Sequence, residues 1–523
     1  MKTPYRRPSK ARYTSACALL LGLGTPSLAW AQQKSPVTET APEDERKDTG
    51  SLGLAPGIPQ VSALPGGFAP AYSPDAQKNE DWHADFHGYV SMPLRLGFNN
   101  RAGNVTDQQY STVIHAPPVV PEYRDAFSYT SVLTDPYVQL NFAYGNSVVQ
   151  ANVILQARSA NTAMSFFDAS TRGGITDAFL TFDLPDLSKA VGMKFHVGAF
   201  TNRYGATGEY DEGKYGTPLI ARTNGVGENI IANLKLGDFD IELQQGFQGQ
   251  LDKAPLGIVP GDWNDYADPN IGTGLVHHLH AGIGYKGYGG LGFHYLHAWS
   301  ADERANMGTT PDGKIDVLAA DLRLALHRFG HLYVAGSYTD ALYSRSVGRI
   351  IEIQNALGGP GLMRSYLGPA SNGTGTLLTF GGQYDLSIAR LLYGNAFEGF
   401  SPDIMLSFFA NSTSVTSADA NWDNKQMFKW GTEAAYALWT WVAAGVRFDS
   451  VSQDLSDADK SFYVISPRII FRSDWQSRDQ VTLQYSKYLY GSQVYVRNGS
   501  PAQIDPTINP DEDVISLAAT MWW

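Results

Sequence analysis

From residue 83 to Trp523 the chain consists of segments of about ten residues in which apolar and polar positions alternate, each ended by a turn. The connections between segments alternate as well. Tyr144–Asn146 is a tight turn, the stretch Tyr204–Gly225 is a long loop, and Gly237–Asp238 is tight again. Alternation with a period of two is typical of β-strands. Short turns at one end and long loops at the other are typical of a transmembrane barrel. The pattern therefore predicts an all-β, antiparallel transmembrane β-barrel with short periplasmic turns and long extracellular loops.

The alternation predicts eighteen strands, an even number as expected of a single-chain barrel. Sixteen is the alternative count, because the connection from Leu386 to Ser401 should be a short turn but is long and partly apolar. The predicted strands are 84–98, 128–144, 147–160, 174–184, 192–203, 226–236, 239–250, 273–286, 289–300, 314–327, 331–343, 374–386, 401–415, 426–438, 441–452, 461–473, 479–490 and 513–523.

One face of each predicted strand is almost wholly apolar. Met193, Phe195 and Val197 share one face of their strand, while Lys194 and His196 share the other. Soluble sandwiches also alternate, so the number of strands and the charges on their polar face decide for a membrane barrel. A charged side chain that faces lipid at mid-depth costs about 2–4 kcal/mol for Arg or Lys, so charges on the polar face should line the lumen. The predicted lumen-facing charges are Asp183, Lys194, Lys235, Glu242, Asp321, Arg323, Glu433, Arg447, Asp449, Arg468 and Arg472.

Three of these charges, Arg447, Arg468 and Arg472, lie on neighbouring strands. One interpretation is a basic ladder that lies opposite the acidic residues of the third long loop and sets up a transverse field with them. The alternative is that the arginines are paired within the wall and only line a wide pore. Both interpretations place them inside the barrel.

The N-terminal part of the chain differs in composition. Residues 1–31 have a basic start, an apolar stretch and the small-residue site Ala29–Ala31, which together predict a signal peptide. Residues 32–80 are rich in proline and polar residues without periodicity, which predicts a disordered periplasmic segment. Residues 81–523 are the predicted barrel. The sequence is 43% hydrophobic, yet no later apolar run reaches the length of about 18 residues that a membrane helix needs.

Charge and cysteine content exclude several functions. The single cysteine, Cys17, lies within the predicted signal peptide, so disulfides and thiol catalysis are not expected. Removing the five basic residues of that peptide, which has no acidic residue, changes the formal charge from −12 to −17. Nucleic acid is therefore not an expected partner. Nothing in the pattern predicts a cofactor.

The third long loop, between the fifth and sixth predicted strands, combines glycines with charges of both signs. Glycines allow tight folding near the wall, and charged loops that enter a pore select solutes. We expect this loop to fold inward as a constriction, with an exposed polar loop as the alternative. The candidate constriction residues are Arg203, Glu209, Asp211, Glu212, Lys214 and Arg222.

Five of the eleven histidines cluster at His277, His278, His280, His294 and His297. Pairing across the turn at Lys286–Gly289 sets His280 opposite His294 in the lumen and His277 opposite His297 on the outer face. Paired imidazoles can bind zinc or copper, but no third ligand is identifiable, so we predict no metal site. Polar lining of the lumen is the simpler interpretation.

The sixth long loop, from Ser344 to Thr374, is partly apolar. Its stretch Gly348–Pro360 ends in a Gly-Gly-Pro stop signal, which predicts a short helix. The apolar content predicts that this loop packs inside the mouth.

In the last predicted strand every second residue is apolar, and the chain ends in an aromatic residue. The outward positions are Ile515, Leu517, Ala519, Met521 and Trp523. This resembles the C-terminal assembly signal of outer-membrane barrels, which implies recognition by the barrel-assembly machinery.

The whole pattern resembles the outer-membrane porins of Gram-negative bacteria. Eighteen strands with a long third loop are similar to the maltoporin-like channels, as is the short motif Asp85–Tyr89. The resemblance implies passive diffusion of small hydrophilic solutes, including saccharides, through a homotrimer surrounded by outer-membrane lipid and lipopolysaccharide. Lumen aromatics such as Phe179 and Phe200 have the inward parity for stacking on sugar rings.

A non-enzymatic channel is the function that we predict. The alternatives are a hydrolase in barrel form, whose site needs no local motif, and an adhesin without channel activity.

Overall fold

The structure is a computed structural model, and all the residues that it describes lie between 82 and 522. The described ranges are 82–98, 137–146, 148–159, 171–188, 190–204, 220–250, 274–286, 288–300, 312–347, 350–354, 360–361, 367, 371–394, 403–420, 422–439, 441–452, 454–456, 461–472, 480–490, 496–497, 500–501 and 512–522. The predictions for residues 1–31 and 32–80 lie outside these ranges.

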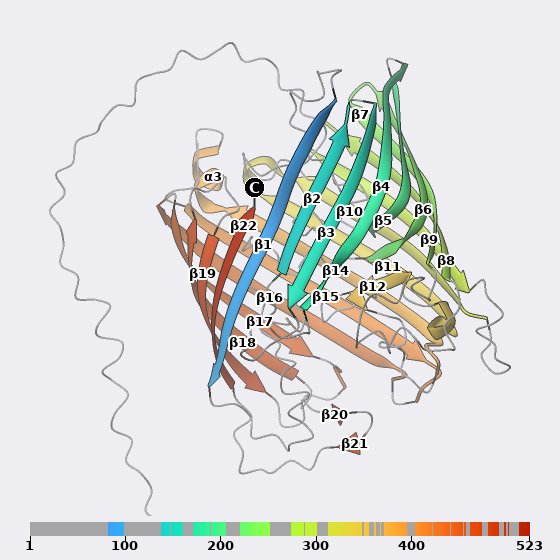
Figure 1. Ribbon diagram of the computed structural model, residues 1–523. Helices are drawn as coiled ribbons and strands as arrows, with labels where there is room; N and C mark the ends of the chain where they lie inside the picture. The colour runs from blue at the N-terminus through green and yellow to red at the C-terminus, as the bar shows by residue number, and fades with distance from the viewer. Residues whose placement is uncertain are drawn as a thin grey trace, which may run out of the picture. The chain divides into compact units, whose positions relative to one another are not determined.

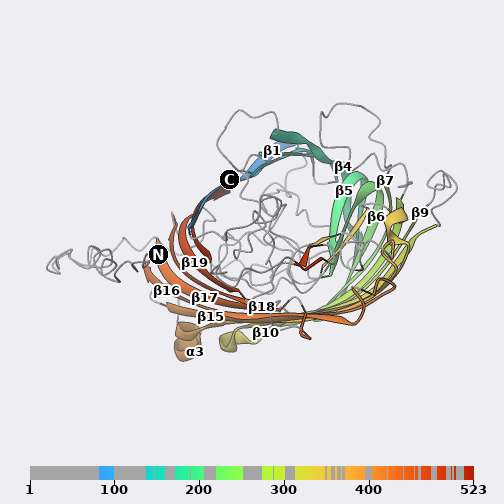
Figure 2. The same cartoon turned by 90° about the horizontal axis from the view of Figure 1, so that it is seen from below.

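Eighteen strands form one closed antiparallel ring, as the alternation predicted, so the alternative count of sixteen is wrong. The ring closes because β1 pairs with both β2 and β22 (Figures 1 and 2). Its strands, in order around the ring, are β1 (His83–Phe98), β2 (Tyr137–Gly145), β3 (Val149–Ser159), β4 (Thr171–Ser188), β5 (Val191–Tyr204), β6 (Ala221–Leu236), β7 (Phe239–Gln250), β8 (Gly274–Tyr285), β9 (Gly289–Ser300), β10 (Lys314–Ala325), β11 (His331–Leu342), β14 (Gly375–Ser387), β15 (Asp403–Ser417), β16 (Lys425–Trp439), β17 (Val442–Ser452), β18 (Ser461–Arg472), β19 (Gln480–Tyr490) and β22 (Glu512–Trp522).

The other described elements are short. The strand β12 adds to β6 and is followed by β13, while β20 and β21 form a separate two-stranded pair. Their bounds, with those of the short helices, are β12 (Ile351–Gln354), β13 (Pro360–Gly361), β20 (Val496–Arg497), β21 (Ser500–Pro501), the 3-10 helices η4 (His327–Phe329) and η5 (Ser344–Val347), and α3 (Ile388–Tyr393). No helix in the described part of the chain is long and apolar enough to cross a membrane.

Tight turns join the strands at one end of the ring, which we call the turn end; the opposite end is the loop end. Between β6 and β7 the turn is only two residues long, and Gly237 has a φ of 64°, which glycine adopts without strain. Between β2 and β3, the Asn146 side chain accepts hydrogen bonds from the backbone N–H groups of Val148 and Val149. Local turn chemistry thus sets the register of these hairpins.

The turns of adjacent hairpins also contact each other. Lys286 Nζ lies 2.6 Å from Asp238 Oδ2. This hydrogen bond raises the pKa of the Lys286 ammonium above its ordinary value. The pair is exposed, so we expect little stabilisation from it.

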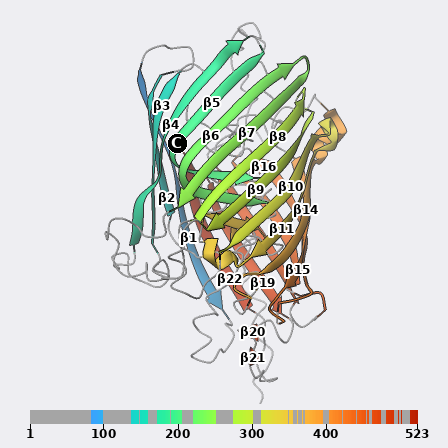
Figure 3. The same ribbon diagram turned by 90° about the vertical axis from the view of Figure 1, so that its right-hand side faces the viewer.

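The two faces of the ring differ in chemistry as the alternation predicted. Outward positions carry large apolar side chains that are exposed, including Phe380 at 61% and Leu318 at 57%. Inward positions on the same or neighbouring strands carry buried polar residues such as Thr379 and Asp321. The strands β5 to β11 lie side by side in this wall (Figure 3). An apolar exterior around a polar interior is the arrangement expected of a barrel surrounded by lipid.

The connection after β14, which fitted a short turn poorly, contains the helix α3. Ser387 caps this helix by accepting a hydrogen bond from the Arg390 N–H. Asp403, at the start of β15, accepts hydrogen bonds from the Ser387 hydroxyl at 2.6 Å and from the Ala389 N–H at 2.8 Å. In its described part the extra length is therefore a capped helical turn, and the strand count is unaffected.

The predicted helix in the stretch Gly348–Pro360 is wrong, since Ile351–Gln354 is the strand β12. Alternate isoleucines, Ile351 and Ile353, are both buried there. A period of two suits an extended segment that adds to the free edge of β6, and this pairing outweighs the local stop signal.

Candidate functional site

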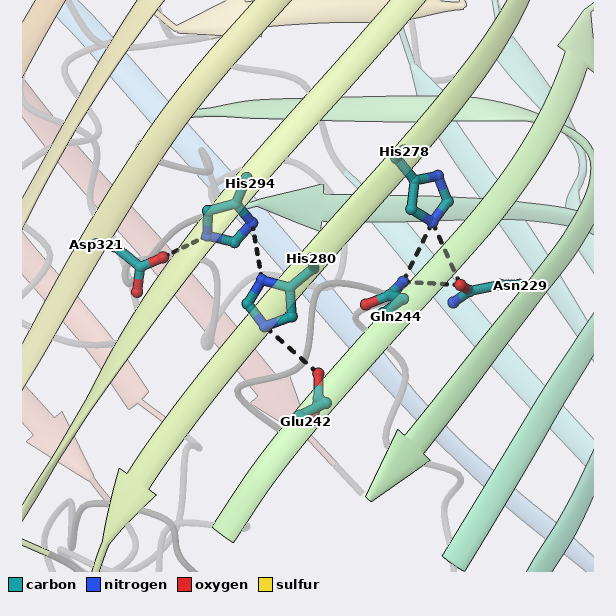
Figure 4. Close-up of polar contacts among 7 residues, drawn as sticks. All are labelled: Asn229, Glu242, Gln244, His278, His280, His294 and Asp321. Atoms are coloured by element: carbon teal, nitrogen blue, oxygen red, sulfur yellow. Dashed lines mark hydrogen bonds and ion pairs between the residues drawn. The ribbon is translucent and has the colours of Figure 1, made fainter. Parts of the chain in front are cut away.

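A row of four titratable side chains runs across the inward face of β7 to β10 (Figure 4). Asp321 Oδ2 lies 2.5 Å from His294 Nε2. His294 Nδ1 lies 3.1 Å from His280 Nδ1, and the two rings stack with centroids 4.5 Å apart. His280 Nε2 then lies 3.6 Å from Glu242 Oε1. Each residue comes from a different strand, and the register sets His280 directly opposite His294, as predicted.

A second polar network lies beside this row on β5 to β8, and Figure 4 shows its members on β6 to β8. His278 Nε2 lies 3.3 Å from Gln244 Nε2 and 3.2 Å from Asn229 Oδ1. Gln244 donates to Asn229 Oδ1 at 2.9 Å, and Asn202 Nδ2 approaches His278 Nε2 at 3.4 Å. The carboxamides therefore hold the imidazole of His278 in one orientation on the wall.

Glycines on inward positions make room for these rings. A Cβ at Gly246 would lie 2.2 Å from Cε1 of His278, and a Cβ at Gly282 would lie 2.9 Å from Nε2 of His280. At Gly292 it would lie 3.2 Å from Cε1 of His280. The imidazoles thus lie over strand positions that lack side chains.

Tyr204 packs against His278 and His294 on the side of the loop end. Its ring meets His278 edge-on at 5.6 Å and His294 at 5.9 Å between centroids. Its hydroxyl lies 3.3 Å from the Thr223 hydroxyl, which donates to Gln248 Oε1 at 2.7 Å. Fully buried, Tyr204 packs the two histidines from one side.

Two ion pairs lie on β16 to β18. Arg447 donates to Asp449 through Nε and Nη2, both at 2.9 Å, and Arg468 forms an ion pair with Glu433. All four side chains are nearly fully buried. Arg447 and Arg468 therefore follow the alternative of pairing within the wall and do not form the basic ladder; the Arg472 side chain lies outside the described residues.

Lys429 is a lumen cation that the sequence interpretation missed. Its Nζ lies 5.2 Å from the ring centroid of Phe409, and the Arg447 guanidinium lies 5.1 Å from the same centroid. Gly431 allows this, because a Cβ there would lie 2.3 Å from Cζ of Phe409. Parity would have found Lys429, which shares the inward positions of its strand with Glu433.

Of the predicted lumen charges, those whose side chains the structure describes lie on inward positions of their strands, by the parity that the exposed apolar residues define. Lys194 also forms an ion pair with Asp183 at 3.0 Å. The other polar lumen residues were missed because neutral carboxamides carry no charge signal. The predicted charges that lie on inward positions are Asp183, Lys194, Lys235, Glu242, Asp321, Arg323, Glu433, Arg447, Asp449 and Arg468.

Two of the candidate constriction residues do not lie in a loop. β5 extends to Tyr204 and β6 begins at Ala221, so Arg203 and Arg222 are strand residues that pair in register. The predicted start of the sixth strand at 226 is therefore wrong. Pairing with β5 already begins at Ala221, before the alternating apolar residues. The remaining candidates, Glu209, Asp211, Glu212 and Lys214, lie outside the described residues.

We call the segment of residues 343–374 the strap, and its described residues pack on the lumen side of the loop end. Its residues Val347, Ile350 and Ile353 are fully buried in an apolar cluster with lumen-facing residues such as Leu296 and Val317. The prediction that this apolar loop packs inside the mouth is confirmed for the described part of the strap.

The strap is also held by backbone contacts. β12 pairs with Ala221–Thr223 of β6, where β7 has already ended. Arg222 Nε donates to Glu352 Oε2 at 2.6 Å, and the Ser417 hydroxyl donates to the Leu367 carbonyl. The strap thus contacts both β6 and β15, which are far apart around the ring, and it links these two parts of the wall.

Of the predicted assembly-signal residues, Ile515, Leu517 and Met521 lie on the outward face of β22 with exposed fractions of 37%, 41% and 52%. Ala519 shares their parity, and Trp523 lies outside the described residues.

The predicted sugar-stacking aromatics pack against each other. The Phe179 and Phe200 rings meet edge-on with centroids 6.1 Å apart, and His196 packs on both. Both phenylalanines are buried. They therefore do not present free ring faces to a solute.

In the described part of the chain, no group of three or more His, Cys, Asp or Glu side chains is arranged to hold a metal ion. His280 and His294 are the paired imidazoles considered above as ligands for zinc or copper. Their Nδ1 atoms contact each other, which leaves no room for a metal ion between them.

No family model and no curated protein matches the sequence. Solved structures with a similar fold include OmpT of Vibrio cholerae, with 10% identity over 87% of this chain and 100% of OmpT and a TM-score of 0.34. Others are Pseudomonas aeruginosa OpdK, solved with vanillate (10% identity, 85% of this chain and 99% of OpdK, TM-score 0.39), and the channel DcaP of Acinetobacter baumannii (10%, 84% and 97%, TM-score 0.34). At these identities and TM-scores, the similarities identify neither a family nor a ligand for this chain.

Proposed function

We propose that the protein is a passive channel for small hydrophilic solutes in the outer membrane of a Gram-negative bacterium. The observation that carries the proposal is the closed ring of eighteen strands with a polar inward face. Rings of about 16–18 strands leave an aqueous channel, because side chains cannot fill so wide a lumen. The exposed apolar outward face suits contact with lipid and lipopolysaccharide.

The inward face supports a preference for hydrated, hydrogen-bonding solutes. Carboxamides and imidazoles on one wall offer both donors and acceptors, and the ion pairs on the other wall neutralise much of each other's charge. Saccharides belong to this solute class, and the proposal of a saccharide preference rests on the resemblance to sugar channels. The narrowing of the lumen by the third long loop stays a prediction, and the strap adds a second element at the mouth.

We also propose that barrels associate as a homotrimer through the outward face of β6 to β14. An apolar groove of about 1160 Å³ lies there, lined mostly by outward side chains such as Leu243, Phe293 and Leu318. Near it, His297 Nδ1 contacts Asp316 Oδ1 at 2.7 Å on the same outward face. Charged groups on a lipid-facing surface are better covered by protein than by lipid.

Light scattering of the detergent-solubilised protein, corrected for detergent, tests the trimer. A mass of three chains supports it, and a mass of one chain contradicts it.

Single-channel conductance in a planar bilayer tests the channel. We expect stable open steps from the folded protein, and addition of maltose-series sugars should reduce them if saccharides bind in the lumen. Open steps without block would retain the channel and remove the saccharide preference. A folded barrel without conductance would contradict the proposal and favour the hydrolase or adhesin.

A further inference from the structure

The contact between His280 and Glu242 differs from the others in the row. Its atoms, His280 Nε2 and Glu242 Oε1, lie 3.6 Å apart, which is too long for a hydrogen bond. Glu242 Oε1 is buried and has no hydrogen-bond partner. Both side chains are largely buried, at 8% and 12% exposed. A buried carboxylate oxygen without a partner is unfavourable, so a group that binds this oxygen in the gap is stabilised there.

The hydrogen bonds along the row determine which atoms face this gap. At 2.5 Å from the Asp321 carboxylate, His294 Nε2 must carry a proton and donate. In a neutral imidazole the Nδ1 of His294 is then an acceptor, so His280 Nδ1, 3.1 Å away, donates to it. His280 Nε2 is left as a lone pair, and it faces a carboxylate oxygen of Glu242. Two acceptors thus face each other across the gap.

We propose that this gap is a binding site for a divalent transition-metal cation, with His280 Nε2 and Glu242 as its two protein ligands. Zinc, copper and nickel are the ions that imidazole favours. Metal–ligand distances of about 2.0–2.2 Å at a tetrahedral angle place two ligand atoms about 3.3–3.6 Å apart. The observed separation of 3.6 Å therefore fits a metal ion between the two atoms.

The rest of the row supports His280 as a ligand. Metal-binding histidines usually donate their other ring N–H to a fixed acceptor, which sets the tautomer and the ring orientation. Here the acceptor is His294, which Asp321 holds in turn. The stacked rings and the glycines at Gly282 and Gly292 keep His280 flat against the wall with Nε2 towards Glu242.

Two protein ligands leave the remaining coordination positions to water, which gives weak and exchangeable binding. The positive charges of Arg323 and Lys194 lie near Glu242 and lower the affinity for a metal ion further. The effect of Lys194 is reduced by its ion pair with Asp183. In a lumen, weak binding suits an ion that must enter and leave. Binding itself does not depend on whether the ring conducts.

Isothermal titration calorimetry of the untagged, folded full chain in detergent tests the site, with ZnCl₂, CuCl₂ and NiCl₂ as separate titrants and MgCl₂ as a hard-cation control. We expect saturable binding of the transition metals that is lost or at least ~10-fold weaker in His280→Ala and in the near-isosteric Glu242→Gln. Asp321→Asn should weaken it by ~10-fold or more, since it removes the support of the ligand. His277→Ala is the matched control, because His277 lies on the same strand and faces outward; it should bind like the wild type.

Wild-type protein without saturable binding would overturn the site. So would His280→Ala that binds like the wild type, or equal binding of Mg²⁺, which would indicate a site of carboxylates only. Resistance of each folded variant to SDS at room temperature checks that the barrel is intact. Conductance measured with and without Zn²⁺ is a separate readout, so a failure of the channel proposal leaves the calorimetric result interpretable.

Discussion

At the scale of single residues, the ring of His278 lies against the backbone of Gly246 on the neighbouring strand. No side chain larger than hydrogen fits between them, since a Cβ on Gly246 would lie 2.2 Å from the imidazole and 2.9 Å from the Glu228 carbonyl. The imidazole is fully buried, and Gln244 and Asn229 hold it in place. The inward glycines therefore determine where the lumen imidazoles lie.

We expect Gly246→Ala to destabilise the barrel by about 1–3 kcal/mol, because the added methyl group forces His278 off the wall and breaks its contacts. Guanidinium unfolding followed by tryptophan fluorescence measures the change. Gly174→Ala on β4 is the control, since no atom lies within 4 Å of its added Cβ. Equal stability of the two variants would show that His278 moves aside at no cost.

At the scale of elements, the strap is attached to the ring by packing more than by charge. Ile351 and Ile353 alternate inward from β12 and are fully buried, whereas the ion pair of Arg222 and Glu352 is partly exposed, at 30% and 25%. A partly exposed pair contributes about 1 kcal/mol or less. The apolar cluster therefore decides whether the strap stays on the wall.

Ile353→Ala should destabilise the packing of the strap by about 2–5 kcal/mol, because it leaves a cavity in that cluster. The expected result is faster cleavage within residues 343–374 during limited proteolysis of the folded protein. Ile404→Ala is the matched control: it removes the same atoms from an outward position that is 43% exposed, and the strap should stay protected. Unchanged cleavage in Ile353→Ala would mean that the backbone contacts alone hold the strap.

At the scale of the whole ring, closure removes the free edges that an open sheet would expose. The outward face then carries its apolar side chains into lipid, with Leu483 and Ile469 in the wall and Tyr393 on α3 at the turn end. Membrane residence thus follows from one face of the ring and the aqueous lumen from the other.

Leu483→Arg should cost about 2–4 kcal/mol in lipid bilayers, because it places a charge on the lipid-facing wall. Tyr393→Arg, at a residue that is 66% exposed on α3, should change the stability by about 0–1 kcal/mol, as expected near the membrane interface. Guanidinium unfolding of both variants in liposomes gives the comparison. Similar small effects at both positions would indicate that Leu483 does not face lipid.

Local patterns predicted much of this structure. Alternation located all eighteen strands, and the short turn at Lys286–Gly289 gave the pairing of His280 with His294. Both succeed because side-chain parity and hairpin register depend on residues close together in the chain. The start of β6 was missed because its pairing with β5 begins before the alternating apolar residues, and β12 was missed because its partner lies far away in sequence.

The sequence by itself determined the fold class, the number of strands and the face on which each side chain lies, because a period of two is a local property. Only the tertiary structure decided which inward side chains meet beyond a single hairpin. Arg468 reaches Glu433 two strands away, and the strap joins Glu352 to Arg222, 130 residues distant. Such contacts depend on strand tilt, ring closure and the space that glycines leave, and none of these is encoded in one segment.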